Sequence, residues 1–246
     1  MWRIDQTQAS LNASGLSARV NLQRPDLGIA DLVWQGTPVV GARLLQVRRP
    51  RSDAGQHLVD AYVRGTDLIA MYESRLSGAV ATQLYWRYVE HADLCAAGFE
   101  LIVSVQTGLL DDDPGLALIS ELPCSELLQA ANRDATCFAR VPVPETEAEG
   151  PCRCAGVGLF LYRFGKVRGG YLEMVYPADF CTAEFGPEAN PENMRSRFTL
   201  FEERLEKGVI RRARARGLLC LDTRDGEAVA GECYRRWLAS ESPLSV

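Results

Sequence analysis

Apolar and polar residues alternate through much of the first half of the chain. The stretch LVDAYVRG, residues 58–65, sorts its side chains onto two sides, with Val59, Ala61 and Val63 on one and Asp60, Tyr62 and Arg64 on the other. A period of two is typical of a β-strand with one buried face. The Arg64-Gly65-Thr66 sequence then predicts a tight turn into an antiparallel neighbour.

The same alternation predicts two further strands before residue 110. ATQLYWRYV, residues 81–89, places Leu84, Trp86 and Tyr88 on one face and Gln83, Tyr85 and Arg87 on the other. FELIVSVQT, residues 99–107, separates Phe99, Leu101, Val103 and Val105 from Glu100, Ser104 and Gln106. Each of these strands therefore has one face suited to a core and one polar face.

Two shorter strands are predicted in the second half. They are VGLFLYRFGK, residues 157–166, and GGYLEMVYP, residues 169–177. In the second strand Glu173 shares its face with Tyr171 and Val175, so a carboxylate is placed in an apolar setting.

The charged stretch 197–221 is predicted as two strands that break near Gly208, because a glycine inside a helix is costly and the arginines alternate with small residues. Residues 141–154 are rich in proline and glutamate and indicate a long surface loop.

The period changes at the C-terminus. Val229, Cys233 and Trp237 stand four residues apart behind Asp225, which predicts one amphipathic helix with an N-terminal cap. A second short helix is predicted for SELLQAAN, residues 125–132. With roughly a dozen strands, these elements predict a single all-β domain over residues 1–246.

Composition and charge narrow the class of protein. The 246 residues are 47% hydrophobic and 24% charged, with a net charge of -5, which fits a globular protein and argues against a nucleic-acid partner. The start, MWRIDQTQAS, has no signal-peptide pattern, and no apolar run is long enough to span a bilayer. We expect a cytoplasmic protein that does not bind membranes.

The sequence predicts neither a metal site nor a cofactor. The eight cysteines are expected to be reduced thiols, and Cys152 with Cys154 forms a C-x-C pair that lacks a second pair at zinc-site spacing. No P-loop, G-x-G-x-x-G, G-x-S-x-G or H-E-x-x-H motif is present, which argues against nucleotide, α/β-hydrolase and zinc-protease chemistry.

Three stretches, taken in order, resemble the galactose-mutarotase-like family. Residues 41–45, GARLL, resemble the motif that opens the family's first sheet. Leu172-Glu173 followed by Pro177 resembles its L-E segment, and Leu205 with Gly208 resembles the turn into its last core strands. The resemblance covers most of the chain. It implies a large two-sheet antiparallel super-sandwich that binds a carbohydrate.

The family's L-E glutamate is the catalytic base of the true aldose epimerases, so the resemblance implies that role for Glu173. The two functional histidines of the epimerases are missing, because His57 and His91 lie too early in the chain. An epimerase-like isomerase with this sequence would need another acid, such as Tyr62, His91 or an arginine-polarised water.

Both catalytic candidates have plainer interpretations. A strand glutamate such as Glu173 is equally a solvated or salt-bridged residue. His91 follows a strand and sits beside Glu90 and Asp93, which is equally typical of a surface turn.

The polar strand faces supply the ligand-binding candidates. Sugar sites combine aromatic rings with side chains that form several hydrogen bonds, although an ordinary solvated sheet face has the same composition. The candidates are Asp60, Tyr62, Arg64, Gln83, Tyr85 and Arg87. The arginines of residues 211–216 fit either an anionic ligand or pairing with Glu202, Glu203 and Glu206.

Two functions from different classes follow. The first is a carbohydrate- or sugar-derivative-binding protein, with isomerisation at the anomeric carbon as the reaction if it is an enzyme. The second is a non-catalytic β-sandwich that mediates protein association through the strand faces around Tyr85 and Arg87. The sequence leaves a homo-oligomer open in both cases.

Overall fold

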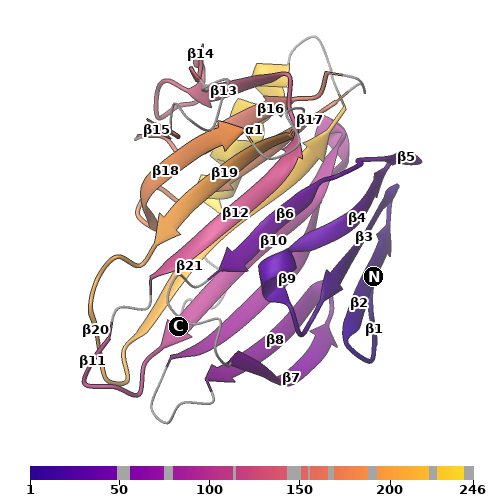
Figure 1. Ribbon diagram of the computed structural model, residues 1–246. Coiled ribbons are helices and arrows are strands. Elements are labelled where there is room, and N and C mark those ends of the chain that lie inside the picture. Colours follow the sequence, from indigo (N-terminus) through magenta and orange to yellow (C-terminus); the bar gives the residue numbers. More distant parts are fainter. Residues whose placement is uncertain are drawn as a thin grey trace.

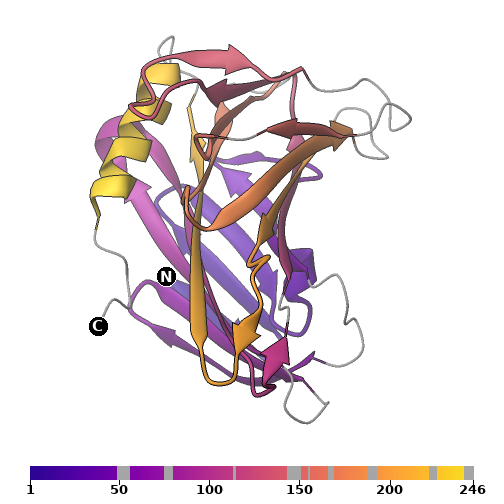
Figure 2. The same ribbon diagram turned by 90° about the vertical axis from the view of Figure 1, so that its left-hand side faces the viewer.

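The fold is described from a computed structural model. It describes residues 1–48, 56–74, 80–112, 115–142, 151–154, 156–165, 169–187, 193–221 and 226–240. These residues form two large antiparallel sheets stacked as two layers, with one α-helix outside the sandwich (Figures 1 and 2). The predicted all-β class is confirmed.

The first sheet has ten strands among the described residues. Nine of them follow one another in space as β1 (Trp2–Asp5), β2 (Gln8–Ala13), β3 (Leu16–Asn21), β4 (Ile29–Trp34), β6 (Arg43–Arg48), β12 (Leu116–Pro123), β19 (Asn193–Leu200), β18 (Phe180–Pro187) and β15 (Cys152–Cys154). The short β5 (Thr37–Pro38) pairs with β4.

The second sheet has nine strands. Their order in space is β14 (Phe138–Arg140), β13 (Glu126–Ala130), β16 (Leu159–Arg163), β17 (Gly170–Val175), β21 (Ile210–Cys220), β10 (Ala96–Gln106), β9 (Ala81–His91), β8 (Asp67–Ser74) and β7 (Gln56–Arg64). The remaining elements are a two-stranded ladder of β11 (Asp111–Asp112) with β20 (Leu205–Glu206), and the 3₁₀ turns η1 (Pro25–Leu27) and η2 (Ala92–Leu94).

The main core lies between the two sheets. It is filled by large side chains that include Trp86, Phe99, Phe160 and Phe198. The predicted inward faces of β9 and β10 are confirmed by this core, because Leu84 and Trp86 belong to it.

A second core lies outside the nine-stranded sheet, under helix α1 (Gly226–Ala239). Cys233 and Trp237 of α1 pack with Leu172 and Met174 of β17. The predicted C-terminal amphipathic helix is therefore confirmed, while its predicted cap Asp225 lies outside the described residues. Because α1 covers one face of β17 and the main core covers the other, this strand is buried on both sides.

Several local predictions are tested directly. The break near Gly208 is confirmed, since β19 and β21 are separate strands and Gly208 has a φ of +85°. The turn after Arg64 is also confirmed, because Arg64 pairs with Asp67 at the head of an antiparallel hairpin.

Two predictions are wrong. The expected helix at 125–132 is the strand β13, whose pairing with β14 and β16 outweighs the helical preference of its residues. The expected loop at 141–154 contains β15, which pairs with β18. Residues 143–150 of that loop lie outside the described residues. In the described part of the chain, no helix has the length and apolar character needed to cross a membrane.

Candidate functional site

The outer face of the nine-stranded sheet carries a row of charged side chains. Because the strands pair without a shift between Asp60 and Arg64 and along β9 and β10, side chains of neighbouring strands stand side by side. The charges alternate across five strands in the order Arg64, Asp67, Arg87, Glu100 and Arg216. In this row the outer face of the sheet carries charged side chains, whereas the inner face of the same sheet packs against the apolar core.

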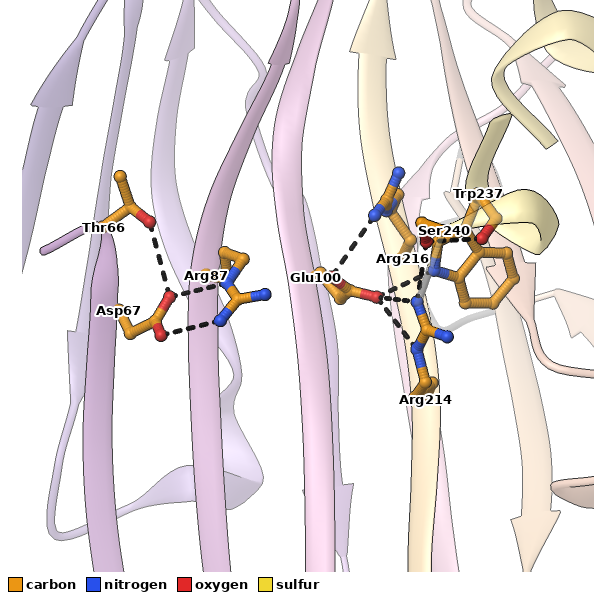
Figure 3. A network of polar contacts seen from close by, with 8 residues as sticks. All are labelled: Thr66, Asp67, Arg87, Glu100, Arg214, Arg216, Trp237 and Ser240. Carbon is orange, nitrogen blue, oxygen red and sulfur yellow. Dashed lines mark hydrogen bonds and ion pairs between the residues drawn. The ribbon is translucent and has the colours of Figure 1, made fainter. Parts of the chain in front are cut away.

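Arg87 is held in a fixed orientation by Asp67. Its Nε lies 2.7 Å from Oδ1 of Asp67 and its Nη2 lies 2.9 Å from Oδ2, which is a bidentate ion pair (Figure 3). The hydrogen bonds to Asp67 raise the pKa of the Arg87 guanidinium, so Arg87 keeps its positive charge. The side chain of Arg87 remains 31% exposed, which leaves part of the guanidinium open to a ligand.

Glu100 is the centre of a buried ionic cluster. Its Oε1 accepts hydrogen bonds from Nη2 of Arg214 at 2.9 Å and from Nε1 of Trp237 at 2.8 Å, and its Oε2 accepts one from Nη2 of Arg216 at 3.3 Å (Figure 3). Burial by itself raises the pKa of Glu100. Arg216, the indole and Arg214 outweigh that effect and leave the pKa below its ordinary value.

The cluster fixes α1 on the sheet. The guanidinium groups of Arg214 and Arg216 lie 5.4 and 5.7 Å from the ring centre of Trp237, within cation–π range. Ser240 accepts a further hydrogen bond from Arg214. The sequence placed Trp237 in the amphipathic helix, but its bond to Glu100 could not be predicted because the partners are 137 positions apart.

A second row on the same face contains the two candidate tyrosines. Tyr62, Ile69, Tyr85 and Ile102 stand next to one another on β7, β8, β9 and β10. Tyr85 packs with both isoleucines and is only 7% exposed, whereas Tyr62 is 39% exposed.

The hydroxyl of Tyr85 is surrounded by polar groups. Its pKa is raised, first by burial and then by the Tyr62 hydroxyl, while Arg64 and Arg212 act in the opposite direction. The groups that influence Tyr85 therefore come from β7, β8 and β21. A third row adds Asp60, Met71, Gln83, Ser104 and Arg212.

The structure brings all six predicted ligand-binding residues onto this one face. They stand on β7 and β9 with β8 between them, and they are Asp60, Tyr62, Arg64, Gln83, Tyr85 and Arg87. We call this surface the polar face. The alternation of the sequence was enough to place these residues on one face. The predicted burial of the other face of β7 is wrong, because Val59 and Val63 are exposed at this edge strand.

Glu173 lies on the opposite side of the sheet. It is fully buried between the two sheets, and it accepts hydrogen bonds from the hydroxyls of Ser120 at 2.5 Å, Tyr162 at 2.7 Å and Ser196 at 2.7 Å. Burial raises the pKa of Glu173, and the three hydrogen bonds offset that rise only in part. Glu173 therefore links both sheets through a closed polar cluster.

Glu173 and Arg64 do not share a pocket. Glu173 shares its face with Tyr171 and Val175, as expected, but that face is the inter-sheet core. The plainer interpretation of Glu173 as a solvated or salt-bridged residue is wrong, since its bonding partners are hydroxyls and its exposure is 0%. A base in this position has no contact with a ligand on the polar face.

His91 is the last residue of β9 and stands opposite Ala96. Its Nε2 is buried without a hydrogen-bond partner among the described residues. Burial lowers the pKa of His91, and the charges of Arg216 and Arg236 lower it further. The imidazole is therefore neutral, and it lies at the end of the strand under α1, about 13 Å along β9 from Arg87.

The arginines of β21 divide between two partners. Arg211 pairs with Glu203 at 3.3 Å, as the hairpin interpretation predicted. Arg214 and Arg216 instead bind Glu100, which the sequence did not indicate. The predicted C-x-C pair, Cys152 and Cys154, has its sulfurs 4.0 Å apart, and the described residues contain no group of three or more side chains suited to a metal.

A groove of about 890 Å³ runs beside α1 on the outer side of the sheet. Its walls include the rings of Tyr176 and Tyr234, with Leu238 of α1 and Pro177. The Tyr176 ring meets Trp237 edge-on, with centroids 6.2 Å apart, so the groove borders the Glu100 cluster. The groove could not be predicted from the sequence, because its walls come from four separate parts of the chain.

Comparisons with known proteins support the fold. No protein-family model matches the chain, and no curated protein sequence matches it. The fold is similar to a crystal structure described as a "putative aldose 1-epimerase" from Klebsiella pneumoniae subsp. pneumoniae MGH 78578. The TM-score is 0.57 at 8% identity, over 97% of this chain and 87% of that one. A 4-alpha-glucanotransferase from Thermococcus litoralis aligns with a TM-score of 0.49 at 8% identity, over 85% of this chain and 37% of that one.

The chain is therefore an all-β two-sheet sandwich whose fold is similar to that of the Klebsiella protein. At this level of identity, the likeness to the Klebsiella protein concerns the fold alone. The two-sheet antiparallel sandwich that the sequence resemblance implies is confirmed.

Proposed function

We propose that this chain binds a carbohydrate or sugar derivative on the polar face of the nine-stranded sheet. The observation that carries the proposal is the placement of Asp60, Tyr62, Arg64, Gln83, Tyr85 and Arg87 together on that face. The similarity of nearly the whole fold to the Klebsiella protein supports the same class of ligand.

The chemistry of the polar face suits a sugar. The exposed ring of Tyr62 offers a surface for the C–H side of a pyranose, while Arg64 and Asp60 beside it donate to and accept from hydroxyl groups. Arg87 is held by Asp67 before any ligand arrives, so little conformational entropy is lost when it binds.

Binding on this face does not require Glu173, which contacts the opposite sheet. An isomerase activity would therefore have to use outward-facing groups. Asp60 and Tyr62 are the exposed carboxylate and hydroxyl that lie next to one another along this face of β7.

The test is saturation-transfer NMR against aldoses, sugar phosphates and uronic acids. We expect at least one of these sugars to bind. We expect Tyr62→Ala to weaken the affinity for that sugar about three- to tenfold through loss of ring stacking. Tyr176→Ala is the matched control, because Tyr176 has a similar exposure of 36% but lies in the groove. This control variant should bind the sugar with the same affinity as the wild type.

Three results would count against the proposal: no binding across the panel, equal binding by the wild type and Tyr62→Ala, or a loss confined to Tyr176→Ala. Exchange spectra on the same samples test for isomerase activity. Accelerated interconversion of anomers that survives Glu173→Gln would assign the reaction to groups on the polar face.

A further inference from the structure

Strand β7 is an open edge of the nine-stranded sheet. Among the residues that the structure describes, it pairs with β8 and with no other strand. Three of its apolar or aromatic side chains are strongly exposed, namely Val59 at 48%, Tyr62 at 39% and Val63 at 37%. An exposed edge of this length is a template for pairing with another strand.

The hairpin fixes which backbone groups face the open edge. Arg64 and Asp67 flank the two-residue turn, and the residues that flank such a turn exchange hydrogen bonds with each other. Because backbone groups alternate along a strand, Tyr62 and Asp60 also point toward β8. The N–H and C=O groups of Ala61 and Val63 point toward the open edge.

We propose that β7 pairs with β7 of a second copy of this chain, antiparallel, about a two-fold axis at Tyr62. In this register Ala61 stands opposite Val63 of the second copy, so the outward backbone groups of both strands form hydrogen bonds. Asp60 stands opposite Arg64 of the second copy, and the two-fold axis repeats this ion pair. Tyr62 stands opposite Tyr62 of the second copy.

Charge complementarity selects this register over its neighbours. A two-fold axis at Ala61 places Asp60 opposite Tyr62, and an axis at Val63 places Asp60 opposite Thr66. The axis at Tyr62 is therefore the one among these three that pairs the carboxylate with the guanidinium. The bulge between Leu58 and Asp60 ends the regular edge on one side, and the turn at Gly65 ends it on the other.

The pairing leaves the polar face open, because Asp60, Tyr62 and Arg64 project perpendicular to the sheet. It joins two polar faces into one surface across the dimer axis. The dimer depends on the backbone and charges of β7 and not on carbohydrate binding, so the two proposals fail independently.

Sedimentation velocity over a wide range of protein concentration tests the dimer. We expect the wild type to dimerise, and we expect D60R and R64D each to weaken the dimer at least about tenfold, because both symmetric ion pairs become repulsive. The double variant D60R/R64D restores opposite charges across the axis and should recover the wild-type affinity. A monomeric wild type, or a double variant as weak as the singles, would overturn the proposal.

Cross-linking supplies a second test, which does not depend on whether the charge variants fold. Residues on the axis face each other in a non-hydrogen-bonded pair, whose spacing suits a disulfide. Tyr62→Cys should therefore form a bond between two copies on mild oxidation, detected by mass spectrometry as a peptide linked through position 62. Met71→Cys, exposed on β8 but away from the edge, should not form one. Equal cross-linking of both variants would contradict the register.

Discussion

Glu100 and Glu173 are both buried, yet their surroundings act on them in opposite directions. Glu100 lies among two guanidinium groups and an indole N–H, which stabilise its charge. Glu173 has three hydroxyl partners and no cation among its contacts within the described residues, so the cost of burying its charge dominates. The two residues therefore make opposite contributions to the pH dependence of stability.

Glu173→Gln tests the core cluster. The pKa of Glu173 is raised in the folded state above its ordinary value of 4.5, so the folded state binds the proton more tightly than the unfolded state does. The stability that Glu173 contributes is present below pH 4.5 and is lost as pH rises through the folded pKa. Denaturation at several pH values should show Glu173→Gln gaining stability relative to the wild type as pH rises. A difference that stays constant with pH would contradict this account.

Glu100→Gln should show the opposite trend. The pKa of Glu100 is lowered in the folded state, so its contribution is present above pH 4.5 and is lost on acidification. At neutral pH the variant leaves Arg214 and Arg216 without a counter-charge, and we expect a loss of about 3 kcal/mol in the free energy of unfolding. Urea denaturation at neutral and acidic pH measures both effects. A loss that grows as pH falls would show that the cluster is assigned wrongly.

At the scale of elements, the docking of α1 decides which parts of the outer face are apolar and which are polar. The helix covers β16 and β17 with Cys233 and Trp237, and it ends beside Glu100. The outer sides of β7 to β9 lie beyond it and carry the polar face. Trp237 therefore joins the second core to the charged row.

Trp237→Phe tests this junction. The variant keeps an aromatic ring but loses the N–H that donates to Glu100, and a hydrogen bond to a charged group contributes about 2 kcal/mol. Hydrogen exchange should show faster exchange of the α1 amides, with the amides of β7 and β8 unchanged. Uniformly faster exchange would mean that α1 is not a separately anchored element.

The element scale also shows where sequence is sufficient and where it is not. Alternation placed Leu84 and Trp86 in the core and Tyr85 and Arg87 on the outer face, because polar residues flank Tyr85 along that face of β9. It did not predict that Tyr85 is buried there between Ile69 and Ile102. It could not decide which way Glu173 points, since β17 is buried on both sides and both of its faces are apolar. The sequence predicted α1, but it did not predict which strands the helix packs against.

At the scale of the whole molecule, the inner and outer faces of the nine-stranded sheet have separate roles. The inter-sheet core, including Glu173, holds the sandwich together, and the outer side of the nine-stranded sheet presents the polar face. The two-sheet fold implied by the family resemblance is confirmed, while Glu173, to which the resemblance assigned the role of catalytic base, is buried between the sheets. The missing histidines are consistent with that separation of fold from catalytic pair.

The most direct test of the central claim is NMR chemical-shift mapping with the tightest-binding sugar of the panel. We predict shifts in the amides of β7, β8 and β9 and in the side-chain Nε–H signals of Arg64 and Arg87. The chemical shifts of the amides around Glu173, and of those lining the groove at Tyr176 and Tyr234, should not change. Shifts confined to the groove or to the Glu173 cluster would contradict the assignment of the polar face as the carbohydrate site.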